Sequence, residues 1–276
     1  METHIPGVIE TAHLFTPLDT ELITLLRSLS PDDWHKQTLA PLWTVKDVAA
    51  HLLDGNIRTI SMMRDHYQAV KADVHSYQEL IDFLNGLNAE WVKAMKRMSP
   101  VLLTELLEST GREYGALMAA SDLEAPAPFS VAWAGEQESK NWFHVAREFT
   151  EKWHHQQQIR YAVQKHGAMQ REFLYPVIDC FMRALPHTYR LTPAPEGTTV
   201  QVMIDNDAWT IMRTPGEWAF ASSGNSKRDA TIRTDAETAW KLFTKAMKGA
   251  AAGERTSVSG EKYLTDPFFS MISIMG

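Results

Sequence analysis

Three side chains of this sequence have the types and the spacing of a metal centre. Glu151 and His155 lie four residues apart in the segment EFTEKWHHQQQIR, and His51 lies in the earlier segment WTVKDVAAHLL. Residues four apart on a helix share one face, so Glu151 and His155 would point in the same direction. A second helix carrying His51 could complete a site of two histidines and one carboxylate. Three protein ligands leave one position open, which is typical of a catalytic divalent metal.

Simpler interpretations compete with this one. His51 alone has the pattern of a hydrogen-bonded core histidine, and an acid and a histidine four apart can also be a solvated pair on a helix surface. His154 is a rival of His155, but it lies about 100° around the helix from it, so we expect only one of them to point into the site. The residue four positions before His154 is Thr150, a poor zinc ligand. The spacing therefore favours His155.

Apolar residues at helical spacing predict a helical first half. The expected helices cover about 8–28, 44–67, 76–98, 100–120 and 139–164. Thr44 followed by Asp47 is close to a capping box at the start of the second helix. The proline-containing stretch 121–138 predicts a loop. We expect a four-helix bundle with one additional or broken helix, an architecture in which facing side chains build metal sites.

The pattern changes after Gly167, where alternation of apolar and polar residues becomes common. Strands are expected near 200–204, 208–214, 217–223, 230–234 and 257–259, and helices over 169–185, over 235–248 and from about 266. Strands flanked by helices indicate an α+β class. The sequence thus predicts a metal-binding helical domain at 1–167 and an α+β domain at 168–276.

Composition excludes several classes of protein. A net charge of −7 without a basic stripe argues against a nucleic-acid partner. Cys180 is the single cysteine, which rules out an intrachain disulfide and suits a reducing compartment. No secretion signal and no run of about 18 apolar residues is present, so we expect no membrane partner and a cytoplasmic location. The chain also lacks the GxSxG turn of serine hydrolases and a glycine-rich phosphate loop.

Both metal-ligand segments resemble a known family. WTVKDVAAHL resembles a block of the DinB-like proteins, specifically of the maleylpyruvate isomerase N-terminal domain, and EKWHHQQQIR resembles that family's second block, E-x-W-x-H. ATIRTDAETAWKLF and VSGEKYL are similar to the sterol-carrier-like domain that follows in mycothiol-dependent isomerases. The resemblance implies a DinB-like four-helix bundle joined to a small α+β domain. It also implies zinc held by His51, Glu151 and His155.

The resemblance implies an enzyme that uses zinc and a low-molecular-weight thiol such as mycothiol, and that acts on an electrophilic small molecule. The thiolate would add to an electron-poor double bond, and elimination after rotation makes an isomerase, whereas release of the adduct makes an S-transferase. Arg58 and Arg160 are candidate anchors for substrate carboxylates. The family often has an acid three residues after the metal histidine, where this chain has Gln158. That departure leaves the identity of the thiol open.

Two other functions stay open from the sequence. A zinc hydrolase would carry a water of pKa near ~7 in the open position, but it needs a separate base that we cannot name. A non-catalytic protein would bind a small apolar ligand in a cleft, which Trp43, Trp133 and Trp153 could line. The sequence does not determine the oligomeric state.

Overall fold

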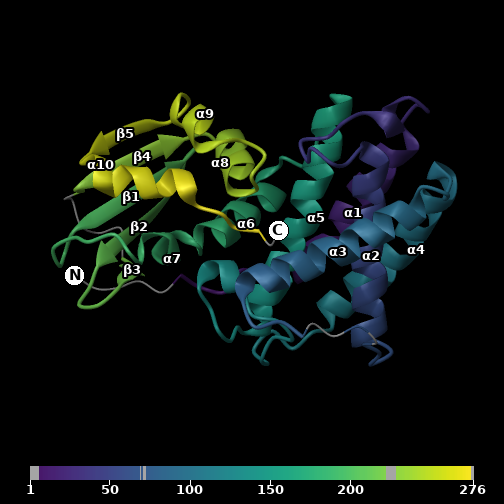
Figure 1. Ribbon diagram of the computed structural model, residues 1–276, viewed down its shortest axis with the longest axis horizontal. Coiled ribbons are helices and arrows are strands. Elements are labelled where there is room, and N and C mark those ends of the chain that lie inside the picture. Colours follow the sequence, from purple (N-terminus) through teal and green to yellow (C-terminus); the bar gives the residue numbers. More distant parts are fainter. Residues whose placement is uncertain (1–5, 69, 71–72, 222–227, 275–276) are drawn as a thin grey trace. The chain divides into compact units, whose positions relative to one another are not determined.

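The computed structural model describes residues 6–68, 70, 73–221 and 228–274, which pack into two compact units (Figure 1). The helical unit consists of 10–125 and 145–174, and the sheet-bearing unit contains 126–144 and 175–274 together with the N-terminal segment up to Ile9. Both units are therefore built from segments that are far apart in the sequence. The division into functional domains between 167 and 168 stays a prediction, and the packing units differ from it chiefly at 126–144.

Long helices make up the helical unit. They are α1 (Phe15–Arg27), α2 (Val45–Met63), α3 (Tyr77–Met95), α4 (Pro100–Ala119) and most of α5 (Asn141–Val163), with a short 3-10 turn, η1 (Ala12–Leu14), before α1. Pro17 falls in the first turn of α1, where a missing N–H has no partner to lose. The helical first half expected from periodicity is confirmed.

Polar caps determine where these helices begin. At the start of α2, the Thr44 backbone N–H and hydroxyl both donate to Oδ2 of Asp47, at 3.0 and 2.8 Å. The Lys96 ammonium, just after α3, lies 2.6 Å from the other oxygen of Asp47. Ser76 and Ser99 accept hydrogen bonds from backbone N–H groups in the first turns of α3 and α4. Such caps satisfy amides that have no partner inside the helix.

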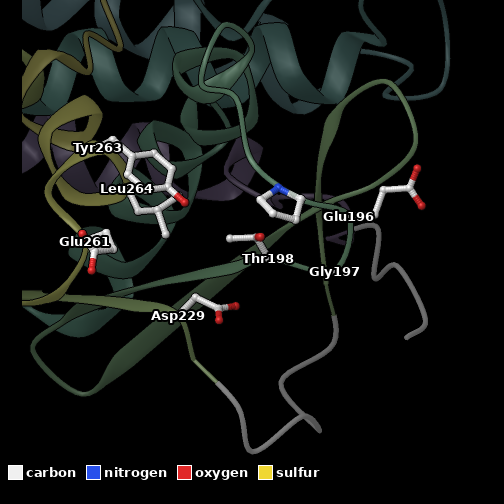
Figure 2. A pocket seen from close by; sticks show the side chains of 8 residues that line it. Glu196, Gly197, Thr198, Asp229, Glu261, Tyr263 and Leu264 are labelled. Carbon is white, nitrogen blue, oxygen red and sulfur yellow. The ribbon is translucent and has the colours of Figure 1, made fainter.

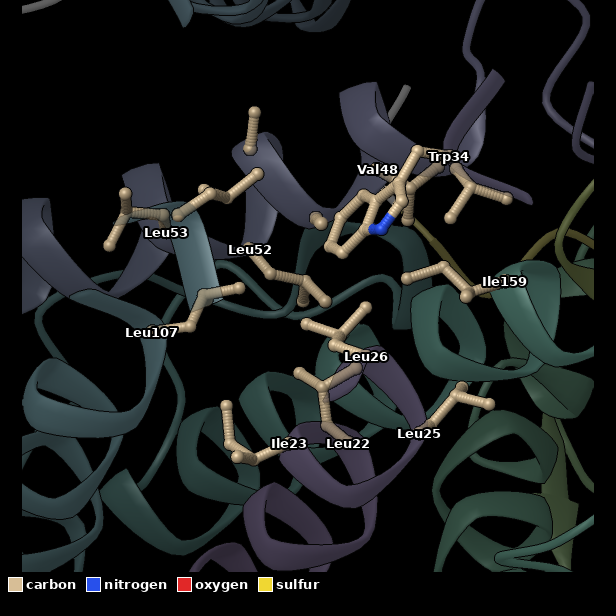
Figure 3. Packing of buried hydrophobic residues seen from close by; sticks show 14 of the residues in the cluster. Leu22, Ile23, Leu25, Leu26, Trp34, Val48, Leu52, Leu53, Leu107 and Ile159 are labelled. Carbon is tan, nitrogen blue, oxygen red and sulfur yellow. The ribbon is translucent and has the colours of Figure 1, made fainter. Parts of the chain in front are cut away.

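A single apolar core joins α1, α2, α4 and α5 (Figure 3). Its members include Leu22, Leu25, Leu26, Val48, Leu52, Leu53, Leu103, Leu107, Ile159 and Val163. Burying each such side chain contributes about 1.5–3 kcal/mol relative to exposure. The core therefore fixes the rotation of α2 and α5 about their axes, and with it the direction of the polar side chains beside it.

The sheet-bearing unit contains five strands in the order β3-β2-β1-β4-β5 (Figure 1). They are β1 (Thr199–Ile204), β2 (Asp207–Arg213), β3 (Trp218–Phe220), β4 (Ala230–Thr234) and β5 (Ser257–Gly260). β4 runs parallel to β1, and the other pairs are antiparallel. Most of α6 (Arg171–Met182), α7 (Leu185–Tyr189), α8 (Ala236–Phe243), α9 (Gly249–Gly253), α10 (Lys262–Thr265) and the 3-10 turn η4 (Asp266–Ser270) accompany the sheet. The expected α+β class is confirmed.

Two expected helices of this half are wrong in extent. The helix expected to reach Lys248 ends at Phe243, because Lys245 adopts a left-handed backbone with φ of 60°. The helix expected from Asp266 is instead α10 followed by the 3-10 turn η4. The end of the third expected strand, 222–223, lies outside the described residues. Among the described helices, none is long and apolar enough to cross a membrane.

Candidate metal centre

α2 and α5 bring four potential ligand side chains together, and we call His51, Glu151, His154 and His155 the candidate centre. Nε2 of His155 lies 3.5 Å from Oε2 of Glu151, one helical turn away. The ring of His51 on α2 stands edge-on to that of His155, with centroids 4.7 Å apart. The two helices thus bring together all three residues that the sequence proposed, whose role as metal ligands stays a prediction.

His154 lies in the same place, contrary to the expectation that only one of the adjacent histidines points inward. One potential ligand atom from each of Glu151, His154 and His155 forms a group in which all atoms lie within 4.8 Å of one another. The two imidazole centroids are only 4.0 Å apart. The expectation from the 100° step between neighbouring residues was wrong. His154 and His155 lie three and four residues after Glu151, so both flank it on one face of α5, and their side chains converge on its carboxylate.

Hydrogen bonds settle which ring nitrogens are free for a ligand. Nδ1 of His154 lies 3.0 Å from the carbonyl oxygen of Thr150, and Nδ1 of His155 lies 2.9 Å from Oε1 of Gln158. Both oxygens only accept hydrogen bonds, so both Nδ1 atoms donate. Each neutral ring therefore carries its lone pair on Nε2. Metal-bound histidines commonly show this arrangement, in which the second nitrogen donates to a fixed oxygen.

This donor set fits a cation. Unless a proton or a metal lies between them, Nε2 of His155 and Oε2 of Glu151 are two acceptors that face each other. In addition, Nδ1 of His51 is buried without a hydrogen-bond partner. Imidazole nitrogens and a carboxylate oxygen are ligands that zinc accepts readily. The facing acceptors on α5 favour a bound divalent ion, while His51 is not a member of the group of ligand atoms within 4.8 Å and approaches it by ring centroid distance alone.

Electrostatics keep these groups in the protonation states that a metal needs. Burial holds the pKa of His51 well below its ordinary value, and the neighbouring His155, Arg58 and His154 lower it further. Burial, followed by the effect of His155, lowers the pKa of His154 to about 4. Burial raises the pKa of Glu151, but His154 and His155 outweigh it, so this pKa lies below its ordinary value. Around neutral pH the centre therefore offers the neutral imidazoles of His51 and His154 and the ionised carboxylate of Glu151.

Residues 15–160, more than half of the 276 residues, match the family model described as the mycothiol maleylpyruvate isomerase N-terminal domain. The chain belongs to this family. Two similar solved structures are crystal structures of the mycothiol-dependent maleylpyruvate isomerase and of a variant of it, with 12% and 13% identity and TM-scores of 0.56 and 0.54. Each comparison covers 95% of this chain and 97% of the other, which supports the fold over nearly the whole length. The comparison with curated proteins gives no match.

Trp43 forms an apolar wall beside the centre of this family member. Its ring centroid lies 4.8 Å from that of His51 and 6.0 Å from that of His155. The loop before α2 holds it there, because the carbonyl of Trp43 accepts hydrogen bonds from the side chains of Gln37 and Thr38. By contrast, Trp153 is fully buried and donates to the Ala168 carbonyl. Of the tryptophans considered from the sequence, Trp43 contacts the candidate ligands.

Gln158, which the sequence marked as a departure from the resemblance, orients His155. Its Oε1 accepts the hydrogen bond from Nδ1 of that ring, one turn along α5. The amide oxygen therefore fixes the orientation of the ring without adding charge.

The two arginines proposed as carboxylate anchors have different surroundings. Arg58 lies one turn beyond Asp54 on α2, with Nε 3.0 Å from that carboxylate, and its side chain is 43% exposed. It lies seven residues, or two turns, after His51 on α2, and its charge lowers the pKa of that histidine. Arg160 is buried and donates to Glu21 and to the carbonyls of Lys165 and His166. These contacts favour a structural role for Arg160, while both anchoring roles stay predictions.

A buried lysine that sequence reasoning missed ties α5 to its neighbours. Lys152 follows Glu151 in the chain and is 6% exposed. Its ammonium donates to Asn56 on α2 at 2.7 Å and to Asp19 on α1 at 3.2 Å, and lies 4.4 Å from the ring centroid of Tyr114 on α4. This lysine therefore holds α5 in position with polar contacts to three helices. No local pattern in the sequence distinguishes it from an exposed lysine.

A pocket in the sheet-bearing unit is separate from the candidate centre (Figure 2). It measures about 360 Å³ and is lined by Pro195, Glu196, Gly197, Thr198, Asp229, Glu261, Tyr263 and Leu264. Asp229 within it accepts a hydrogen bond from the Thr199 backbone N–H at 2.8 Å, which gives it a structural role at the start of β1. None of the residues proposed from the sequence lines this pocket.

Proposed function

We propose that this chain is a zinc-dependent enzyme that uses a low-molecular-weight thiol, as an isomerase or S-transferase of an electrophilic small molecule. His51, Glu151 and His155 would hold the metal. The observation that carries the proposal is the 3.5 Å spacing of His155 Nε2 and Glu151 Oε2, with the His51 ring beside them. Two ligand atoms on one tetrahedral zinc lie about 3.4 Å apart, given metal–ligand bonds of about 2.0–2.2 Å.

A zinc ion held there would bind the thiol sulfur in its open coordination position and favour the thiolate form. Residues of the chain would orient the ligands and bind the substrate. Gln158 keeps the His155 ring turned with Nε2 toward Glu151. Trp43 covers the two imidazoles with an apolar face that excludes water from their side of the centre. Arg58, partly exposed beside His51, would anchor a carboxylate of the substrate.

The similar solved structures suggest which thiol and which class of substrate to propose. The similar solved structures are of a mycothiol-dependent maleylpyruvate isomerase. We therefore propose mycothiol or a related thiol as the cofactor, and as substrate a small unsaturated acid whose double bond is made electron-poor by a carbonyl. A solvent-accessible arginine next to a neutral, metal-binding group suits such an anion.

The first test is the metal itself. Purified protein should contain about one zinc per chain. The two single variants, His51→Ala and His155→Ala, should each have a zinc affinity at least about tenfold lower than the wild type. Substitution of His166, an exposed histidine after α5, by Gln is the matched control and should leave affinity unchanged. Wild-type zinc content in the His51 and His155 variants would remove the basis of the proposal.

The second test is the thiol. The zinc-loaded protein should show a larger rise in melting temperature with mycothiol than with its S-methyl analogue, because only the free thiol can lose its proton and bind zinc as a thiolate. Isomerisation of a cis unsaturated keto acid should then require that thiol. Hydrolysis without any thiol requirement would instead support the zinc hydrolase.

A further inference from the structure

His154 is a buried histidine with no role in the proposed centre of three ligands. It is 2% exposed, compared with 7% for His155. Burying a polar ring beside a carboxylate and another imidazole costs free energy unless the ring gains a partner. Nδ1 has one, the Thr150 carbonyl, and this bond leaves the lone pair on Nε2. Nε2 is thus the atom through which His154 can act.

Glu151 is shared by two helical ligand spacings. Glu151 and His154 are three residues apart, and Glu151 and His155 are four apart, so both histidines lie on the face of the carboxylate. The three-residue spacing of a glutamate and a histidine is itself a source of metal ligands in helical bundles. The segment EKWHH therefore offers one carboxylate and two imidazoles from little more than one turn of α5.

The distances allow all these atoms to reach one ion. Ligand atoms on a tetrahedral zinc lie about 3.4 Å apart, and the Glu151–His155 pair is already at 3.5 Å. The group that also includes His154 has atoms within 4.8 Å of one another. Separations within 4.8 Å exceed the spacing on one ion by at most about 1.4 Å, and rotation of χ angles within their ordinary wells supplies such a movement.

We propose that His154 is a fourth protein ligand of the metal held by His51, Glu151 and His155, and that it binds through Nε2 when no thiol is present. This inference rests on the proposed function and deepens it. Four protein ligands would complete the tetrahedral shell of a zinc ion held there, so the resting centre would be closed to water. A thiol would release its proton to solvent on binding, and its sulfur, a softer ligand than water, would replace Nε2 of His154. The centre would thereby select a thiol over water.

Direct detection of the metal–nitrogen bond tests this proposal in the unaltered full-length chain. The protein is labelled with ¹⁵N in its histidines and loaded with ¹¹³Cd²⁺, whose coupling splits the signal of each nitrogen bound to it. We expect splitting for one ring nitrogen each of His51, His154 and His155. Addition of 2-mercaptoethanol should weaken or abolish the splitting of His154 and leave that of His155.

The possible outcomes separate the inference from the function beneath it. Splitting at His51 and His155 with none at His154 overturns the fourth ligand and leaves the proposed function intact. Splitting at His154 and His155 without His51 makes His154 the third ligand, which overturns both the four-ligand shell and the proposed set of His51, Glu151 and His155. No splitting at any histidine, with no bound cadmium, overturns both.

A variant gives an independent measurement. His154→Gln should weaken Co²⁺ binding at least about tenfold in competition with a chelator, and should change the visible absorption of the bound Co²⁺, because the ligand shell changes. His166→Gln is the control and should leave both unchanged. Wild-type affinity and an unchanged spectrum in His154→Gln would argue against the proposal. If that variant does not fold, the cadmium measurement on the unaltered chain still decides.

Discussion

At the scale of single residues, the centre depends on groups that orient the ligands as much as on the ligands themselves. Gln158 and the Thr150 carbonyl each fix one imidazole by accepting from its Nδ1. The Gln158 acceptor is a side chain and the Thr150 acceptor is a backbone carbonyl, so only the Gln158 acceptor can be removed by substitution. A substitution of Gln158 therefore tests the orientation of His155 without altering a candidate ligand.

We expect Gln158→Leu to lower zinc affinity by about 10–100-fold, because His155 would lose the acceptor that holds its ring. Competition with a chromogenic chelator measures this affinity. Gln158→Glu is the matched variant, since it keeps an acceptor of the same length and should retain most of the affinity. If Leu and Glu have equal effects, the hydrogen bond to His155 has no part in metal binding.

At the scale of helices, Lys152 connects α5 with α1 through an ion pair with Asp19 and with α2 through a hydrogen bond to Asn56. Lys152→Met leaves the Asp19 carboxylate buried without its partner, so we expect a loss of about 3–5 kcal/mol in the free energy of unfolding. Urea unfolding followed by circular dichroism measures it. Asp19→Asn in the same chain should restore part of the loss, while Lys93→Met, at an exposed site on α3, should change little. Equal stability of the single and double variants would contradict the role of this pair.

The capping residue of α2 should make stability depend on pH. Burial raises the pKa of Asp47, but hydrogen bonds from Lys96 and Thr44 outweigh it, so this pKa lies below its ordinary value. A lowered folded-state pKa adds stability that is present above the unfolded pKa of about 3.9 and is lost as pH falls through the folded value. Asp47→Asn should therefore cost about 1–2 kcal/mol at pH 7 and progressively less below about pH 4. The exposed Asp32→Asn is the control, and a cost independent of pH would count against an ionic origin.

The same elements indicate what the sequence could and could not predict. Periodicity and capping residues act locally, so α2, α5 and the strands around Val202 were predictable. The convergence of His154 with His155 was not, because it depends on side-chain rotation after α5 has packed. The contacts of Lys152 join residues up to 133 positions apart, and no local pattern encodes them. The early end of α8 depends on one left-handed residue, Lys245, which is not a glycine.

At the scale of the whole molecule, every residue of the candidate centre belongs to the helical unit. The helical unit is nevertheless interrupted in sequence by 126–144, which packs with the sheet-bearing unit. A cut between 167 and 168 would therefore separate 126–144 from the residues it packs against. The effect of the metal on each unit is best measured in the intact chain.

Zinc should stabilise the helical unit selectively, because its proposed ligands lie on α2 and α5 and none lies on the sheet. With free zinc at about 100 times its dissociation constant, the folded helical unit gains about 2.7 kcal/mol over an opened form that does not bind the ion. Hydrogen exchange that requires this opening should therefore slow about 100-fold. Hydrogen–deuterium exchange read by mass spectrometry should show this slowing in peptides from α2 and α5 and none in peptides from β1, β2 and β4. His155→Ala, which lacks one proposed ligand, should lose the response. Equal slowing in the strands would mean instead that the two units open together, so that the ion stabilises the chain as one cooperative structure.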